Sequence, residues 1–148
     1  MAGQMVPLSV GAMFNAITHS QLLVLDQDEV LDFSVGKLGL EVTADVDMGF
    51  VRRPTVSVPG RPERQILLEK PGVPTMSEET AEQVCEPVTK GAMGGWFILT
   101  TDDCRRTYET LLGKGVEFTE KPTERPYGID CALRDPFGNP IRFTQLKV

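Results

Sequence analysis

The only histidine in the chain, His19, limits the metal chemistry available to these 148 residues. Sites for zinc and related ions are commonly built from several imidazole and thiolate ligands. One histidine rules out any site that needs two or more imidazoles from a single copy of the chain. It can still hydrogen-bond a ligand or act as a general base. His19 is therefore the candidate for catalytic chemistry, if the protein has any.

The three cysteines, Cys85, Cys104 and Cys131, are widely spaced and form no C-x-x-C pair. Their odd number argues against a disulfide framework, so we interpret them as reduced, packed side chains and expect a cytoplasmic protein. Cys104 stands at a predicted helix start, where the helix dipole can lower a thiol pKa, but packing is the simpler interpretation. Asp102 and Asp103 before it are expected to cap that helix, not to form a catalytic pair.

The charge balance excludes two classes of partner. The chain has 21 acidic and 15 basic residues, a formal net charge of −6, and no run of Lys or Arg. Such a surface repels nucleic acid and anionic membranes, so we expect neither partner. Residues 1–14 lack a basic start, and Pro7 and Gly11 interrupt their apolar stretch. We therefore interpret these residues as an N-terminal arm. We do not expect them to be a signal peptide or a membrane span.

The hydrophobic pattern predicts the order strand, helix, strand, strand, strand in two successive modules, at residues 15–70 and 95–148. In the first module Asp26 is expected to cap the helix, whose inward residues include Val30 and Phe33. The predicted strands of the first module are 17–26, 37–46, 51–60 and 64–70. In the second module we predict strands at 96–103, 115–122, 127–135 and 141–147, and a helix at 104–114.

A connecting segment, residues 71–94, joins the two modules and contains one predicted helix. Thr75 and Glu78 have the spacing of a capping box at its start. Pro87 is expected to end the helix, which leaves Val88 a doubtful member of its apolar stripe. The segment is long enough for the modules to pair within one chain or across a dimer.

The two modules are similar in amino-acid sequence as well as in the order of their predicted elements. KLGLEVT recurs 76 positions later as GKGVEFT, and Asp26 recurs as Asp102. One such unit is about half a domain, because a single four-stranded sheet with one helix leaves its concave face bare. Two units that close on each other would leave a cup.

Three segments carry a resemblance to a known family: DQDEVLDFSVGKLGLEV, DDCRRTYETLLGKGVEF and RDPFGNPIRFTQ. They resemble the vicinal oxygen chelate superfamily, which includes glyoxalase I, extradiol dioxygenases and bleomycin-type resistance proteins. The resemblance implies an α+β fold in which paired βαβββ modules form a curved eight-stranded mixed sheet, usually in a homodimer.

Metalloenzymes of that family hold a divalent ion with four inward side chains, one from the first and one from the last strand of each module. The corresponding positions here carry His19, Gln65, Trp96 and Arg142. A register slip would place Glu69 instead of Gln65 at the site. A strict offset of 76 from His19 would place Gly95, not Trp96, in the second module.

The four positions are poorly suited to a dication. A neutral imidazole and amide, an indole and a guanidinium offer no anionic ligand. A close approach of Arg142 to a dication would cost on the order of several kcal/mol. We therefore predict no metal and no other cofactor.

Three functions remain open. The leading one is a metal-free protein that sequesters a hydrophobic aromatic molecule such as an antibiotic, as the resistance proteins of the resembled family do. The second is a glyoxalase-type lyase or isomerase, or a dioxygenase, with an altered divalent-metal site that uses His19 and Glu69. The third is a cofactor-free enzyme for a polyketide-like substrate with His19 as base.

The side chains expected to bind the ligand come from the strands and from the rim of the cup. They are His19, Gln21, Phe50, Gln65, Trp96, Tyr127, Arg142 and Thr144. Met48, Arg52 and Arg53 are further candidates for the rim. Three of these side chains have an alternative of their own: His19 half-buried and bonded to Gln21 or Gln65, Trp96 packed in the core, and Arg142 paired with an acid instead of clamping a carboxylate, phenolate or quinone oxygen. For the rim residues the alternative is ordinary packing within their loops.

Overall fold

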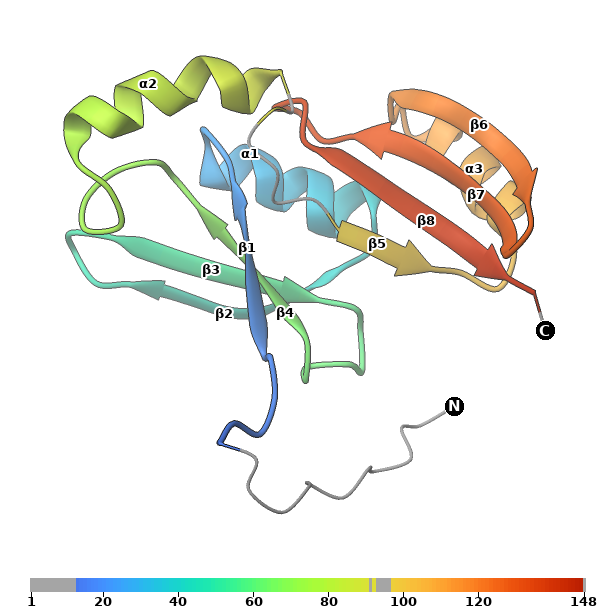
Figure 1. Cartoon of the computed structure of the whole chain (residues 1–148), viewed down its shortest axis with the longest axis horizontal. Coiled ribbons are helices and arrows are strands. Elements are labelled where there is room, and N and C mark those ends of the chain that lie inside the picture. The colour runs from blue at the N-terminus through green and yellow to red at the C-terminus, as the bar shows by residue number, and fades with distance from the viewer. Residues whose placement is uncertain (1–12, 91, 93–96, 148) are drawn as a thin grey trace.

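The computed structural model describes residues 13–90, 92 and 97–147. Both predicted βαβββ modules are present, so the predicted α+β fold of paired βαβββ modules is confirmed (Figure 1). The first module contains β1 (His19–Leu23), α1 (Gln27–Leu31), a π-helical continuation η1 (Asp32–Lys37), β2 (Glu41–Asp47), β3 (Arg52–Ser57) and β4 (Gln65–Glu69). The second contains β5 (Phe97–Thr100), α3 (Cys104–Gly113), β6 (Phe118–Arg125), β7 (Gly128–Arg134) and β8 (Pro140–Leu146).

Each module forms its own four-stranded sheet, with the orders β1-β4-β3-β2 and β5-β8-β7-β6. The first strand runs parallel to the last, with His19 beside Gln65 in one module and Phe97 beside Ile141 in the other. The other neighbours are antiparallel. Among the residues described, no helix has the length and apolar character needed to cross a membrane.

Helix starts follow the predicted caps in both modules. The carboxylate of Asp26 accepts the N–H of Glu29, and that of Asp103 accepts the N–H of Arg106. These bonds satisfy donors that the first helical turn leaves free, so the caps predicted at Asp26 and Asp103 are confirmed. Asp102, the other residue expected to cap the second helix, precedes the N-cap residue.

The connecting helix α2 (Glu78–Thr89) differs from the prediction at both ends. Ser77 caps it, whereas the Thr75 hydroxyl donates to Glu69. The helix passes through Pro87, and Val88 is fully buried. The prediction of an end before Pro87 was therefore wrong: burial of Val88 offsets the one hydrogen bond that the proline removes from the last turn.

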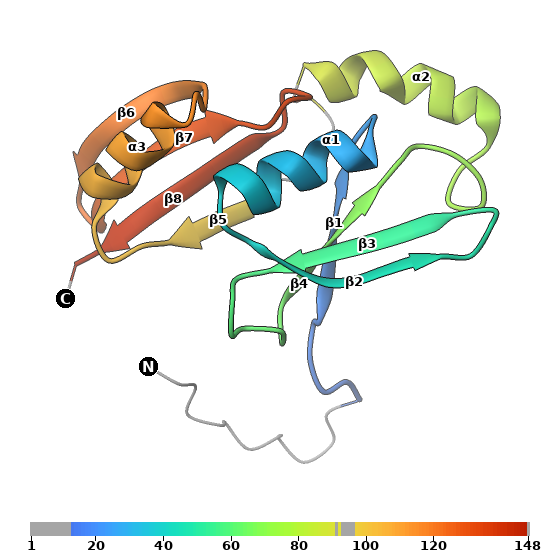
Figure 2. The same ribbon diagram turned by 180° about the vertical axis from the view of Figure 1, so that it is seen from behind.

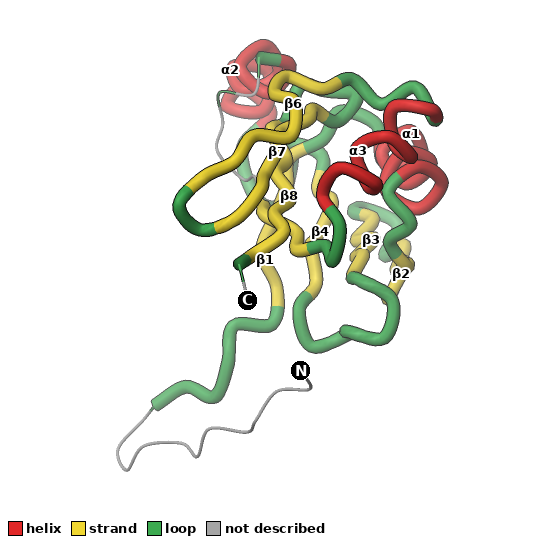
Figure 3. Tube along the Cα trace, turned by 90° about the vertical axis from the view of Figure 1, so that its right-hand side faces the viewer, coloured by secondary structure: helices red, strands yellow, loops and turns green. Residues whose placement is uncertain are grey.

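The core lies on the helix side of the two sheets. Figure 2 shows α1 and α3 in front of the strands, and Figure 3 shows them together on one side of the molecule. Leu38, Phe97 and Leu99 contact both hydrophobic clusters, so the two modules share one packed layer. None of the helices in the described part of the chain covers the other face of either sheet (Figures 1 and 2).

The three cysteines are free thiols. Cys104 and Cys131 are buried with their Sγ atoms 3.9 Å apart, and burial raises the pKa of both. Both are packed, as predicted. The same prediction was wrong for Cys85, which is exposed on α2.

Asn139 ties the second module to the first. Its side-chain Nδ2 donates to the carbonyl of Leu23 and to Oδ2 of Asp135, both at 2.8 Å. We expect Asn139→Ala to lower the free energy of unfolding by about 2–3 kcal/mol, since it leaves a buried carbonyl and a buried carboxylate short of donors. Urea unfolding measures this loss. Asn15→Ala is the matched control, because Asn15 is exposed; an equal loss in both variants would contradict the prediction.

Candidate functional site

The open face of the second sheet carries the largest charged cluster. Along each strand alternate side chains point away from α3, and the strand register aligns them. The side chains on this face are Ile98 and Thr100 of β5, Glu120 of β6, Asp130 and Ala132 of β7, and Arg142 and Thr144 of β8.

Asp130 is the centre of this cluster and is fully buried. Its carboxylate accepts hydrogen bonds from the Tyr127 hydroxyl, from Nε of Arg125 at 3.2 Å and from Nη1 of Arg142 at 2.9 Å. A buried carboxylate needs such partners, because desolvation without them would be costly.

Glu120 is the second acid of the cluster. Its Oε1 accepts Nη2 of Arg125 at 2.6 Å and Nη1 of Arg142 at 3.2 Å, and its Oε2 accepts Nη2 of Arg142 at 3.4 Å. Arg142 thus pairs with acids, one of the two roles foreseen for it. We call Glu120, Arg125, Tyr127, Asp130 and Arg142 the arginine cluster.

The arginine cluster holds fixed charges. Hydrogen bonds from Arg142 and Arg125 lower the pKa of Glu120. Burial raises the pKa of Asp130, but hydrogen bonds from Tyr127 and Arg125 and the charge of Arg142 outweigh it, so the net shift is downward. The bond to Asp130 raises the pKa of Tyr127. Both acids are therefore ionised at neutral pH and the phenol is neutral, which suits binding better than proton transfer.

A hollow adjoins the arginine cluster. It has a volume of about 160 Å³ and is lined by Ala132, Pro140, Ile141 and Arg142. Apolar walls with one charged side chain are the usual composition of a small-molecule site.

The open face of the first sheet carries the remaining strand residues predicted to bind the ligand. His19 is exposed and its Nδ1 lies 2.8 Å from the hydroxyl of Thr18. Gln65 lies beside it in the register but donates to the carbonyl of Pro62 at 3.0 Å. The interpretation of His19 as half-buried and bonded to Gln21 or Gln65 was therefore wrong, because β1 is an edge strand whose first residues are uncovered.

Glu69 is a buried acid with its own partners on this face. It accepts Nε2 of Gln21 at 2.8 Å and the hydroxyl of Thr75, and Nη1 of Arg53 lies 3.6 Å from Oε1. The register places it beside Leu23, four residues along β1 from His19. At 3.3 Å per residue that is roughly 13 Å, so His19 and Glu69 do not share one ion.

The donor set does not fit the divalent ion that the resembled metalloenzymes hold. His19 and Gln65 offer one imidazole and one amide, and Arg142 brings a positive charge that two carboxylates already balance. Across residues 13–90, 92 and 97–147, no three His, Cys, Asp or Glu side chains are grouped as metal ligands would be. Trp96 and Gly95, the alternative fourth positions, lie outside the described residues.

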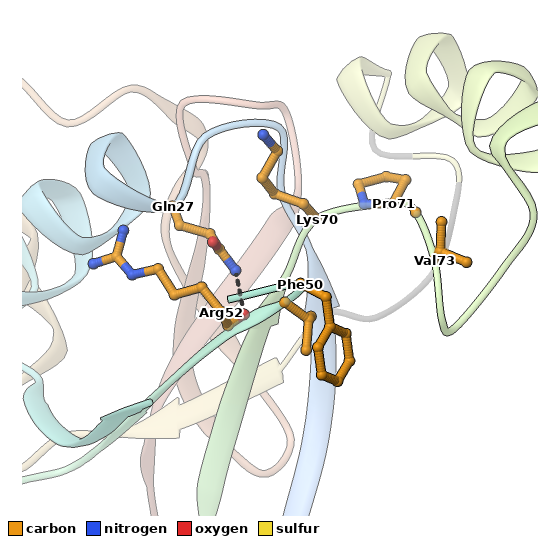
Figure 4. Close-up of a pocket in the computed structure, with 8 residues that line it drawn as sticks. Gln27, Phe50, Arg52, Lys70, Pro71 and Val73 are labelled. Carbon is orange, nitrogen blue, oxygen red and sulfur yellow. Dashed lines mark hydrogen bonds between the residues drawn. The ribbon is translucent and has the colours of Figure 1, made fainter. Parts of the chain in front are cut away.

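Phe50 borders a separate hollow of about 220 Å³ (Figure 4). Its lining residues are Gln27, Phe50, Val51, Arg52, Lys70, Pro71, Gly72 and Val73. The amide of Gln27 donates to the carbonyls of Arg52 and Leu68 at the wall of this hollow. The guanidinium of Arg52 pairs with Asp28 and Asp45, both at 2.8 Å, and these bonds raise its pKa.

The structure thus divides the predicted ligand residues into three groups. Tyr127, Arg142 and Thr144 lie on the second sheet, where Thr144 is buried beside Asp130. His19, Gln21 and Gln65 lie on the first sheet, and Phe50 belongs to the hollow of Figure 4.

Sequence reasoning missed Glu120, Arg125 and Asp130. The signal available was the alternation of β7, which places Asp130 and Ala132 on the same face as Arg142. Using it requires the pairing register of β6, β7 and β8, and two register shifts between β6 and β7 hide that register from the sequence.

Comparisons with known proteins agree with the fold. A family model described as "Glyoxalase/Bleomycin resistance protein/Dioxygenase superfamily" matches residues 16–143. An uncharacterised protein of Shewanella frigidimarina is 30% identical over 140 residues, covering 91% of this chain and 96% of that protein. The crystal structure of UcmS2 is similar, with a TM-score of 0.83, 35% identity, and coverage of 90% of this chain and 99% of that one.

A second solved structure is described by a function. It is TnmS3, an antibiotic binding protein from Streptomyces sp. CB03234, with a TM-score of 0.73 and 25% identity. The similarity covers 92% of this chain and 99% of TnmS3.

Proposed function

Because the chain belongs to the glyoxalase/bleomycin resistance protein/dioxygenase superfamily, we propose that it binds a hydrophobic aromatic small molecule, such as an antibiotic, and sequesters it without a metal. The observation that carries the proposal is the hollow beside Arg142, in a cluster where the charges of Arg125 and Arg142 balance those of Glu120 and Asp130. A balanced guanidinium beside apolar walls suits a neutral or weakly polar organic molecule. The similarity to TnmS3, which is described as an antibiotic binding protein, supports an antibiotic as the ligand.

We further propose that the working form is a homodimer. Each sheet has one face that the helices do not cover, and Ile98 on the second sheet is 55% exposed (Figure 1). A second copy that covers these faces would bury the ligand on both sides, which the small hollow beside Arg142 does not do alone.

Native mass spectrometry of the freshly purified full chain tests both proposals. We expect a dimer, and saturable binding of one or more compounds from a panel of aromatic antibiotics. Each bound compound should be recovered unchanged, because the arginine cluster holds fixed charges and offers no proton donor or acceptor poised near neutral pH.

Two results would contradict the proposal in favour of a metalloenzyme. One is a tightly held Zn, Ni, Mn or Fe in each chain that is lost in His19→Ala. The other is turnover of the methylglyoxal–glutathione adduct or of catechols, with or without added metal. Conversion of a bound antibiotic would instead favour an enzyme that works without a cofactor.

A further inference from the structure

We propose that the arginine cluster recognises an uncharged planar ring system, which stacks on the face of the Arg142 guanidinium while Glu120 and Asp130 hold that group in place. This inference rests on the proposed function and names the ligand class. It replaces the expectation that Arg142 clamps a ligand oxygen.

The hydrogen bonds of Arg142 leave its flat face for the ligand. A guanidinium donates only in its own plane. Nη1 donates to both Glu120 and Asp130, and Nη2 donates to Glu120. The side chain is still 28% exposed. Because these N–H groups already donate to the two acids, stacking on the flat face is the strongest contact that the guanidinium can still make with a ligand.

The strand register explains why the guanidinium lies along the sheet. Ala132 lies beside Arg142 on β7, and Glu120 lies beside Ala132 on β6. The Arg142 side chain therefore crosses Ala132 to reach a residue two strands away, roughly 10 Å between backbones. The methyl group of Ala132 is small enough to be crossed. Ile98 flanks Arg142 on the other side and adds an apolar surface.

The charge of the arginine cluster favours an uncharged ligand. Arg125 and Arg142 balance Glu120 and Asp130, so an anion gains no net attraction and meets two carboxylates. An uncharged ring keeps its cation–π and dispersion contacts with the guanidinium.

The size of the hollow limits the part of the ligand that it holds. Its volume of about 160 Å³ is below the roughly 300–1,000 Å³ of sites that enclose a drug-sized molecule. We infer that it takes one ring system of a larger ligand.

Three small probes with the same bicyclic carbon skeleton test the inference on the full chain: 2-naphthamide, 2-naphthoate and the saturated, non-planar decahydronaphthalene-2-carboxamide. Titration calorimetry of the wild type should show the tightest binding for 2-naphthamide, by roughly 3- to 30-fold over either other probe. In Arg142→Lys, which keeps the charge and a cation–π contact but removes the plane that stacks, the preference for the aromatic amide over the saturated one should fall by about threefold or more.

Glu120→Gln tests the charge argument and does not depend on Arg142→Lys folding. Removing one carboxylate gives the arginine cluster a net charge of +1, so 2-naphthoate should gain about threefold or more relative to 2-naphthamide. Glu63→Gln is the matched control, since Glu63 is exposed and its 3.9 Å ion pair with Arg61 lies outside the arginine cluster. It should leave the relative affinities unchanged.

Different experimental results would contradict this inference and the proposed function. A wild type that prefers 2-naphthoate, an Arg142→Lys variant that keeps the aromatic preference, or a wild type that binds none of the three probes overturns the stacking inference. Binding of the antibiotic panel decides the proposed function independently.

Discussion

Gly128→Ala is expected to lower the free energy of unfolding by about 3 kcal/mol or more, or to prevent folding. A methyl group at Gly128 would lie 2.0 Å from the carbonyl oxygen of Gln145 and 3.0 Å from Cα of Leu146. The φ angle of +148° is also one that side chains rarely adopt. Neither atom can give way easily, because both belong to the backbone of β8. Urea denaturation of the purified variant measures the loss.

Gly36→Ala is the matched control for this substitution. No atom lies within 4 Å of a methyl group at Gly36, which lies in the helix η1. Alanine has the higher helix propensity, so stability should be unchanged or rise by up to about 1 kcal/mol. Equal stability of the two variants would show that β7 and β8 are not paired as described.

Asp130→Asn is expected to lower the free energy of unfolding by about 2–4 kcal/mol at pH 7. The substitution keeps the volume of a fully buried side chain but removes the charge that balances Arg125 and Arg142. Urea unfolding measures the difference. At the exposed ion pair of Glu63, Glu63→Gln should change stability by no more than about 0.5 kcal/mol.

The pH dependence separates lost charge from lost packing. The folded-state pKa of Asp130 is below its ordinary value, so its charge stabilises the fold fully above about pH 5. That stabilisation is lost as the pH falls through the folded-state pKa, when the acid becomes protonated. The gap between wild type and Asp130→Asn should therefore narrow below about pH 4. A gap of constant size from pH 7 to about pH 2 would contradict the electrostatic explanation.

Several features of the fold could be predicted because they depend on short stretches of sequence. Asp26 and Asp103 cap their helices with donors three residues ahead, and the apolar pattern places the eight strands. The end of α2 could not be predicted in this way, because the burial of Val88 between distant segments decides it.

The sequence by itself determined the duplicated βαβββ order, the starts of α1 and α3, and the unsuitability of His19, Gln65 and Arg142 as a set of metal ligands. These features depend on residue types and local periodicity, and both can be read directly from the amino-acid sequence. Only the tertiary structure decided that Arg142 crosses Ala132 to reach Glu120, and that Glu69 is bonded to Gln21 and Thr75. The physical reason is that these contacts join residues brought together by strand register and bulges, which local propensity does not specify.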